Sequence, residues 1–84
     1  MYQVNFYSFL KNIVGSYSVE IPNEIITINE LITHLCTNYS GLQDYLGDNP
    51  EVSMSMGSTT LLLPNDLSKN IIADISISPI ISGG

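Results

Sequence analysis

The chain has 84 residues, of which 44% are hydrophobic and only 12% are charged, and its formal net charge at pH 7 is −6. This length allows one domain with a single modest core, and the apolar content is that of a folded protein. The cations are Lys11 and Lys69 alone, too few for the phosphate contacts that nucleic-acid binding requires.

The sequence also argues against a secreted or membrane-bound protein. Residues 1–6 have neither the basic flank nor the apolar stretch of a signal peptide, and no segment approaches the ~18 apolar residues of a membrane span. The single cysteine, Cys36, excludes an internal disulfide and suits a reducing compartment. We therefore expect a cytoplasmic protein with no nucleic-acid or membrane partner, and a protein partner whose cleft is basic.

Two strands joined by a short helical segment are expected at the N-terminus. Residues 2–7 alternate apolar and polar side chains, which is the pattern of a half-buried strand. Apolar residues in the segment 9–14 have helical spacing, and Gly15 provides a stop. Residues 16–21 alternate again, with Tyr17, Val19 and Ile21 on one side, and predict a second strand that pairs with the first.

The clearest local signal is the start of a helix at Thr27. In a capping box the Thr27 hydroxyl accepts a hydrogen bond from the Glu30 amide, while the Glu30 carboxylate accepts one from the Thr27 amide. An apolar stripe with helical spacing follows, formed by Ile28, Leu31, Ile32, Leu35, Cys36 and Tyr39. Ser40-Gly41 ends this helix, residues 42–46 predict one more turn, and residues 47–50 a loop.

Three further strands are expected in the second half of the chain. Residues 52–56 alternate, with Met54 and Met56 as core side chains, and Gly57-Ser58 can turn the chain into a strand at 59–63. Residues 64–66 break the pattern, and residues 74–78 predict the last strand. The resulting order β, β, α, β, β, β favours an α+β fold, a mixed sheet of four to five strands with one main amphipathic helix packed across it.

The C-terminal segment carries the most informative motif. Glycine has no Cβ, so two glycines in a row can lie extended in a channel too narrow for any side chain, and a terminal carboxylate then becomes the reacting group. We expect a domain at residues 1–78 and an extended tail at 79–84. A partner protein would cover the tail, whose residues are Pro79, Ile80, Ile81, Ser82, Gly83 and the reactive Gly84.

No internal active site is expected. His34 and Cys36 are two apart on a helix and point about 200° from each other, so they cannot share a metal or act as a catalytic pair. Asp44 and Asp48 have no basic or metal partner and suit a solvated loop. We therefore expect no bound cofactor and no metal site.

Taken together, these residues resemble the MoaD/ThiS family of ubiquitin-like β-grasp sulfur carriers, and most closely the small subunits of molybdopterin synthase. The likeness spans the whole chain. Residues 4–15 resemble the opening strand and short helix of the family, residues 27–39 its main helix and residues 42–46 the turn after it. The most specific match is the end, residues 75–84, with a final strand, a proline, an apolar pair, a small residue and a diglycine.

The resemblance implies a chemistry for Gly84. An activating enzyme would use ATP to adenylate its carboxylate, and sulfur from a sulfurtransferase or cysteine desulfurase would displace AMP to leave a thiocarboxylate. The large subunit of molybdopterin synthase would use this sulfur to make molybdopterin, the organic part of the molybdenum cofactor. The chain itself would be a sulfur donor without catalytic groups.

Other functions stay open at this point. The chain could carry sulfur for another pathway, such as the thiamine pathway, or it could be a ubiquitin-like modifier that Gly84 joins to lysines of other proteins. It could also be an adaptor in which the diglycine is incidental.

Overall fold

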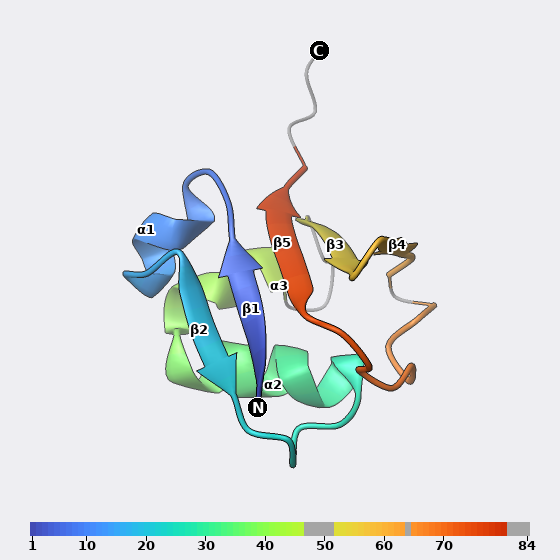
Figure 1. Cartoon of the computed structure of the whole chain (residues 1–84). Helices are drawn as coiled ribbons and strands as arrows, with labels where there is room; N and C mark the ends of the chain where they lie inside the picture. The colour runs from blue at the N-terminus through green and yellow to red at the C-terminus, as the bar shows by residue number, and fades with distance from the viewer. Residues whose placement is uncertain (47–51, 64, 81–84) are drawn as a thin grey trace.

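The computed structural model describes residues 1–46, 52–63 and 65–80 (Figure 1). The elements follow in the order β1 (Tyr2–Phe6), α1 (Leu10–Val14), β2 (Ser18–Ile21), α2 (Ile28–Asn38), the short 3-10 helix η1 (Ser40–Leu42), α3 (Gln43–Leu46), β3 (Val52–Met56), β4 (Thr59–Leu61) and β5 (Ile75–Pro79). The loop predicted at 47–50 lies outside the described residues.

The five strands form one sheet in the order β2-β1-β5-β3-β4. Strand β5 lies between β1, to which it is parallel, and β3, to which it is antiparallel, and the remaining neighbours are antiparallel. Helix α2 packs across one face of this sheet, and the other face is open (Figure 1). The fold is therefore the α+β arrangement that the sequence predicts, a mixed sheet with one main helix.

The core lies between the sheet and α2, and the alternation along the strands determines its members. Val4 and Phe6 of β1 and Ile75 and Ile77 of β5 are fully buried, as are Leu31 and Leu35 of α2. Met54 is also fully buried and Met56 nearly so, which confirms both methionines as core residues. No helix in the described ranges is long and apolar enough to cross a membrane.

The capping box predicted at the start of α2 is present with both of its hydrogen bonds. The Glu30 amide donates to the Thr27 hydroxyl at 3.2 Å, and the Thr27 amide donates to the Glu30 carboxylate at 3.0 Å. The same carboxylate oxygen accepts from the Ile26 amide at 3.2 Å. These backbone hydrogen bonds, with Thr27 as the larger contributor, lower the pKa of Glu30 below its ordinary value.

Strands β2 and β4 are each two residues shorter than predicted, whereas the ends of β1 and β5 differ from the prediction by one residue. Tyr17, expected on the core side of a strand at 16–21, precedes β2 and is 52% exposed, because Gly15 ends α1 in a left-handed conformation (φ 85°) and the pairing with β1 begins at Ser18. Strand β4 ends at Leu61, two residues before the predicted end. The Leu62 amide donates to the Asp66 carboxylate at 2.8 Å, which turns the chain away from the sheet.

The replacement Thr27→Ala removes the hydroxyl that accepts from the Glu30 amide. Loss of an N-cap of this kind costs about 1 kcal/mol of unfolding free energy, with a fall in melting temperature of about 4–8 °C for a domain of this size. Thr33→Ala is the matched control, because Thr33 is exposed in the middle of α2, where alanine favours the helix. Thermal unfolding of both variants measures the difference, and equal melting temperatures would contradict the role of the cap.

The lowered pKa of Glu30 predicts a dependence of stability on pH. The contribution of the ionised carboxylate is complete above the ordinary glutamate pKa of 4.5 and is lost as the pH falls through the lower folded-state value. Glu30→Gln keeps an oxygen that can accept from the amides but does not titrate. Urea unfolding at neutral and at acidic pH should therefore show a smaller acid destabilisation for Glu30→Gln than for the unmodified chain. An identical acid destabilisation of the two proteins would exclude Glu30 as its source.

Candidate functional site

The candidate site is the end of the molecule at which β5 finishes. Strands β1 and β5 run in the same direction, so both end there, next to α1 (Figure 1). The Tyr7 amide, just past β1, donates to the carbonyl of Ile77 in β5 at 3.0 Å. Strand β5 is hydrogen-bonded to β1 on one side and to β3 on the other. These two neighbours fix the position at which β5 ends.

The structure places the first part of the predicted tail. Pro79 is the last residue of β5, pairs with Val52 of β3 and is partly buried, whereas Ile80 is 58% exposed. A proline suits the last position of a strand, because it has no amide to donate to a continuing ladder. The other predicted site residues, Ile81, Ser82, Gly83 and Gly84, lie outside the described residues.

Exposed aromatic side chains surround this end of the sheet. Tyr7 packs edge-on against Tyr17 with a distance of 5.4 Å between ring centroids, and Phe9 packs against Tyr45 at 5.3 Å. Tyr7 is 38% exposed and Phe9 41% exposed, so both pairs offer apolar surface to solvent. Aromatic side chains of this kind are enriched at protein interfaces. These two pairs lie at the end of the sheet where the predicted tail begins.

These aromatic residues were not predicted from the sequence as part of the site. One usable signal was the alternation in residues 2–7, which places Tyr7 opposite the core. No comparable signal existed for Tyr17, whose spacing from Val19 and Ile21 predicts a core position.

Hydroxyl groups at this end interact with one another. Hydrogen bonding with the side chain of Tyr17, and then with that of Ser76, lowers the pKa of Tyr7. The same contact with Tyr7 raises the pKa of Tyr17, as expected for the partner that donates. The tyrosine pair therefore joins the residue after β1 to the segment before β2, and Tyr7 also interacts with Ser76 of β5.

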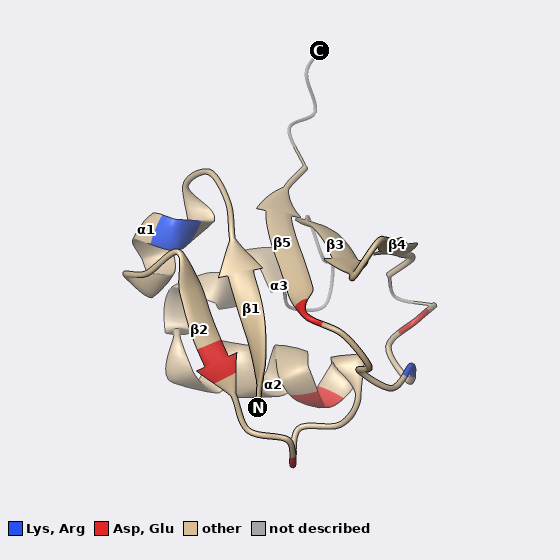
Figure 2. Ribbon diagram, viewed as in Figure 1, with Lys and Arg blue, Asp and Glu red and all other residues tan. Residues whose placement is uncertain are grey.

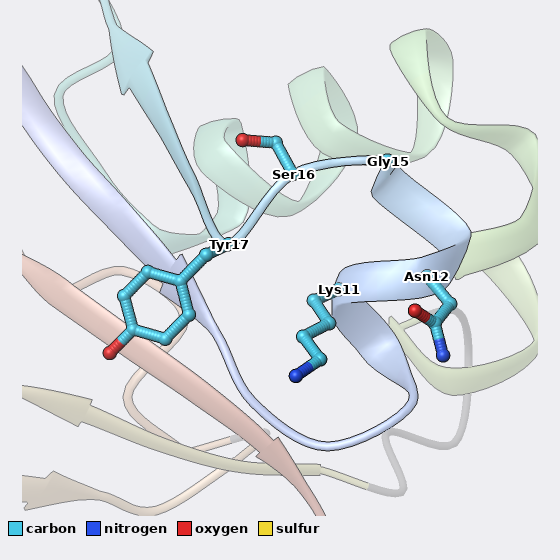
Figure 3. Close-up of a pocket in the computed structure, with 5 residues that line it drawn as sticks. All are labelled: Lys11, Asn12, Gly15, Ser16 and Tyr17. Atoms are coloured by element: carbon cyan, nitrogen blue, oxygen red, sulfur yellow. The ribbon is translucent and has the colours of Figure 1, made fainter.

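A shallow hollow of about 330 Å³ lies beside Tyr17 and α1 (Figure 3). It is lined by Lys11, Asn12, Gly15, Ser16 and Tyr17. Lys11 gives this end of the molecule a positive charge, whereas most of the acidic side chains of the described ranges lie toward the opposite end (Figure 2). The hollow is open to solvent.

His34, Cys36 and Asp44, which were considered as catalytic or metal-binding residues, lie on α2 and α3. Within residues 1–46, 52–63 and 65–80, no group of three His, Cys, Asp or Glu side chains could hold a metal ion. His34 and Cys36 are both partly buried on α2, and burial raises the pKa of the Cys36 thiol, which keeps it protonated. Asp44 is exposed on α3, and Asp48 lies outside the described residues.

The fold matches solved structures over nearly its whole length. The crystal structure of SAMP1 from Haloferax volcanii has a TM-score of 0.76 and 17% identity, with 98% of this chain and 97% of that chain covered. The solution structure of the small archaeal modifier protein 1 from Methanosarcina acetivorans has a TM-score of 0.74 and 18% identity, with coverage of 98% and 94%. No protein-family model and no curated protein sequence matches the chain.

A third solved structure is a Pyrococcus furiosus protein assigned as subunit 1 of molybdopterin converting factor. Its TM-score is 0.69 at 11% identity, and the match covers 94% of this chain and 95% of that chain. Identities this low show a common fold and leave the activity to be argued from the residues. The chain has the ubiquitin-like β-grasp fold that these structures share.

Proposed function

We propose that this chain is a carrier protein whose reacting group is the carboxylate of Gly84, activated by a separate adenylating enzyme. The observation that carries the proposal is the position of the diglycine motif relative to β5. The strand is fixed in the centre of the sheet, it ends at Pro79, and Ile80 is already largely exposed. Residues 81–84 come next in the sequence, and they end in two glycines, which are narrow enough to enter a channel that excludes side chains.

The chemistry begins with attack of a Gly84 carboxylate oxygen on the α-phosphorus of ATP, which releases pyrophosphate and forms an acyl adenylate. The terminal sulfur of a persulfide on a sulfurtransferase or cysteine desulfurase then attacks the Gly84 carbonyl, AMP leaves, and an acyl disulfide joins Gly84 to the donor. A second thiol attacks the donor's sulfur in this S–S bond and forms a disulfide with the donor, which releases Gly84 as a thiocarboxylate. ATP is a substrate of the activating enzyme in this scheme, and the chain itself binds no cofactor.

We assign the sulfur to molybdopterin synthesis, with this chain as the small subunit and a separate large subunit as the catalyst. The likeness to the Pyrococcus furiosus protein, which is assigned to molybdopterin converting factor, supports this pathway. In such a complex the large subunit would contact Pro79 and Ile80 and the exposed aromatic residues Tyr7 and Phe9, while the glycines enter its active site. The domain would supply position and orientation, and the tail would supply the sulfur.

A second function is supported by a different observation. Two of the matching structures are modifier proteins, and their similarity to this chain is as high as that of the molybdopterin protein. In a modifier, the amine of a lysine on a target protein would attack the activated Gly84 carbonyl and form an isopeptide bond. Both functions share the adenylation step and differ only in the nucleophile. Immunoblots of native cell extracts would separate them, because a modifier gives conjugates of higher mass and a carrier does not.

The replacement Gly84→Val tests the shared step. A branched side chain at the reacting residue displaces the carbonyl from the α-phosphate, and a misplacement of about 1 Å costs about a hundredfold in rate. Pyrophosphate exchange with ATP and the activating enzyme is therefore expected to fall by at least about that factor. Leu62→Ser is the control, since Leu62 is an exposed apolar residue in the segment after β4. Normal exchange by the Gly84→Val chain would overturn the proposal.

A further inference from the structure

The end of the molecule opposite the candidate site carries exposed apolar side chains that the proposed function does not use. The start of β1, the end of β2, the segment before α2 and the segment before β5 meet there (Figure 1). The Tyr2 hydroxyl donates to the Ile25 carbonyl at 2.8 Å, and the Ile71 amide donates to the Ile26 carbonyl at 2.7 Å. These hydrogen bonds fix the segments relative to one another.

Two isoleucines of this end are exposed although their neighbours are packed. Ile72 is 85% exposed, the largest value for a large hydrophobic residue in the described part of the chain, and Ile26 is 53% exposed. The adjacent residues Ile25 and Ile71 pack against the core. Ile26 and Ile72 are therefore exposed apolar side chains whose neighbours in the chain are held in place by packing. A partner that covers them would remove apolar surface from water without the entropy cost of ordering a loop.

Acidic residues lie in the same segments as the two isoleucines and in the strand β2. Glu20 of β2 lies opposite Gln3 of β1, and the Gln3 amide donates to the carboxylate of Asp74 at 3.0 Å, so acidic residues flank this part of β1. Glu24, in the segment before α2, is exposed. We call Glu20, Glu24, Ile26, Ile72 and Asp74 the acidic pole, and Figure 2 shows this concentration of acidic residues away from the end of β5.

The other charged residues at this end do not cancel the negative charge. Glu30 adds a carboxylate, although its oxygen is occupied by the amides of Thr27 and Ile26. Two cations lie at this end, the exposed Lys69 in the segment before β5 and the N-terminal ammonium group of Met1 at the start of β1; the other lysine, Lys11, is in α1. Carboxylates thus outnumber cations around Ile26 and Ile72.

This charge limits what can cover the isoleucines. A second copy of the chain would bring one acidic pole against another, and an anionic membrane would be repelled in the same way. A protein segment that carries lysine or arginine beside apolar side chains satisfies both features at once, because its cations pair with the carboxylates while its apolar groups cover the isoleucines.

We propose that the acidic pole is a second docking surface, which binds a basic segment of a partner protein with apolar side chains between its cations. The pole lies at the opposite end of the sheet from Pro79, so this partner can bind while the tail reacts elsewhere. A carrier with two separate surfaces can be held by one protein and processed by another. The proposal does not depend on the chemistry of Gly84.

An NMR titration of the full-length, ¹⁵N-labelled chain tests the proposal. The probe is a designed amphipathic peptide with leucine on one face and lysine on the other. The amide signals of Ile26, Ile72 and Asp74 are expected to shift, while those of Phe9 and Ile80 stay in place. For Ile72→Ser the Kd should rise at least about fivefold, as expected for a central interface residue, and for the control Leu62→Ser it should not change.

Two further probes separate this surface from the tail and from simple charge attraction. A chain that lacks Gly83 and Gly84 should bind the peptide as tightly as the full chain. A peptide with serine in place of leucine should bind more weakly at every salt concentration. The proposal is wrong if the shifts centre on Phe9 and Ile80, if a folded Ile72→Ser chain binds with unchanged Kd, or if the serine peptide binds equally well.

Discussion

The position of β5 between β1 and β3 is the constraint on which the rest of the structure depends. Its side chains Ile75 and Ile77 are fully buried in the core between the sheet and α2. Backbone ladders on both sides fix its direction, since β1 is parallel to it and β3 antiparallel. A strand held in this way delivers whatever follows it to one end of the domain, and in this chain a diglycine sequence follows.

The two ends of the sheet differ in charge and in exposed apolar groups, and this difference suits a protein that binds different partners at its two ends. The end at which β5 finishes carries Lys11, exposed aromatic rings and the exit of the tail, whereas the opposite end carries carboxylates around Ile26 and Ile72. Under the proposed function, the activating enzyme and the large subunit supply the catalytic groups, and the domain supplies the surfaces on which they dock. Such a division lets the domain stay rigid while the tail alone enters an active site.

The sequence predicts elements whose signals are local and leaves out features that depend on neighbours in space. Thr27 and Glu30 lie within one turn, so their capping box could be read directly, as could the alternation of Val52, Met54 and Met56. Tyr17 was misplaced because spacing alone cannot tell where pairing with β1 begins. Likewise, the aromatic pairs at the candidate site join residues from different elements, and the order of the strands follows from packing that no single segment encodes. The exposure of Ile72 was equally hidden, since nothing in the sequence distinguishes it from the adjacent Ile71, which packs against the core.

The central claim is that the last carbonyl of the chain is the atom that reacts. Mass spectrometry of the C-terminal peptide, taken from protein isolated from its own cells, tests this most directly. The account predicts a fraction in which sulfur replaces one carboxylate oxygen of Gly84, or in which Gly84 is joined to a lysine of another protein. A Gly84 carboxylate found free in every fraction, in cells that need the protein for growth, would contradict it.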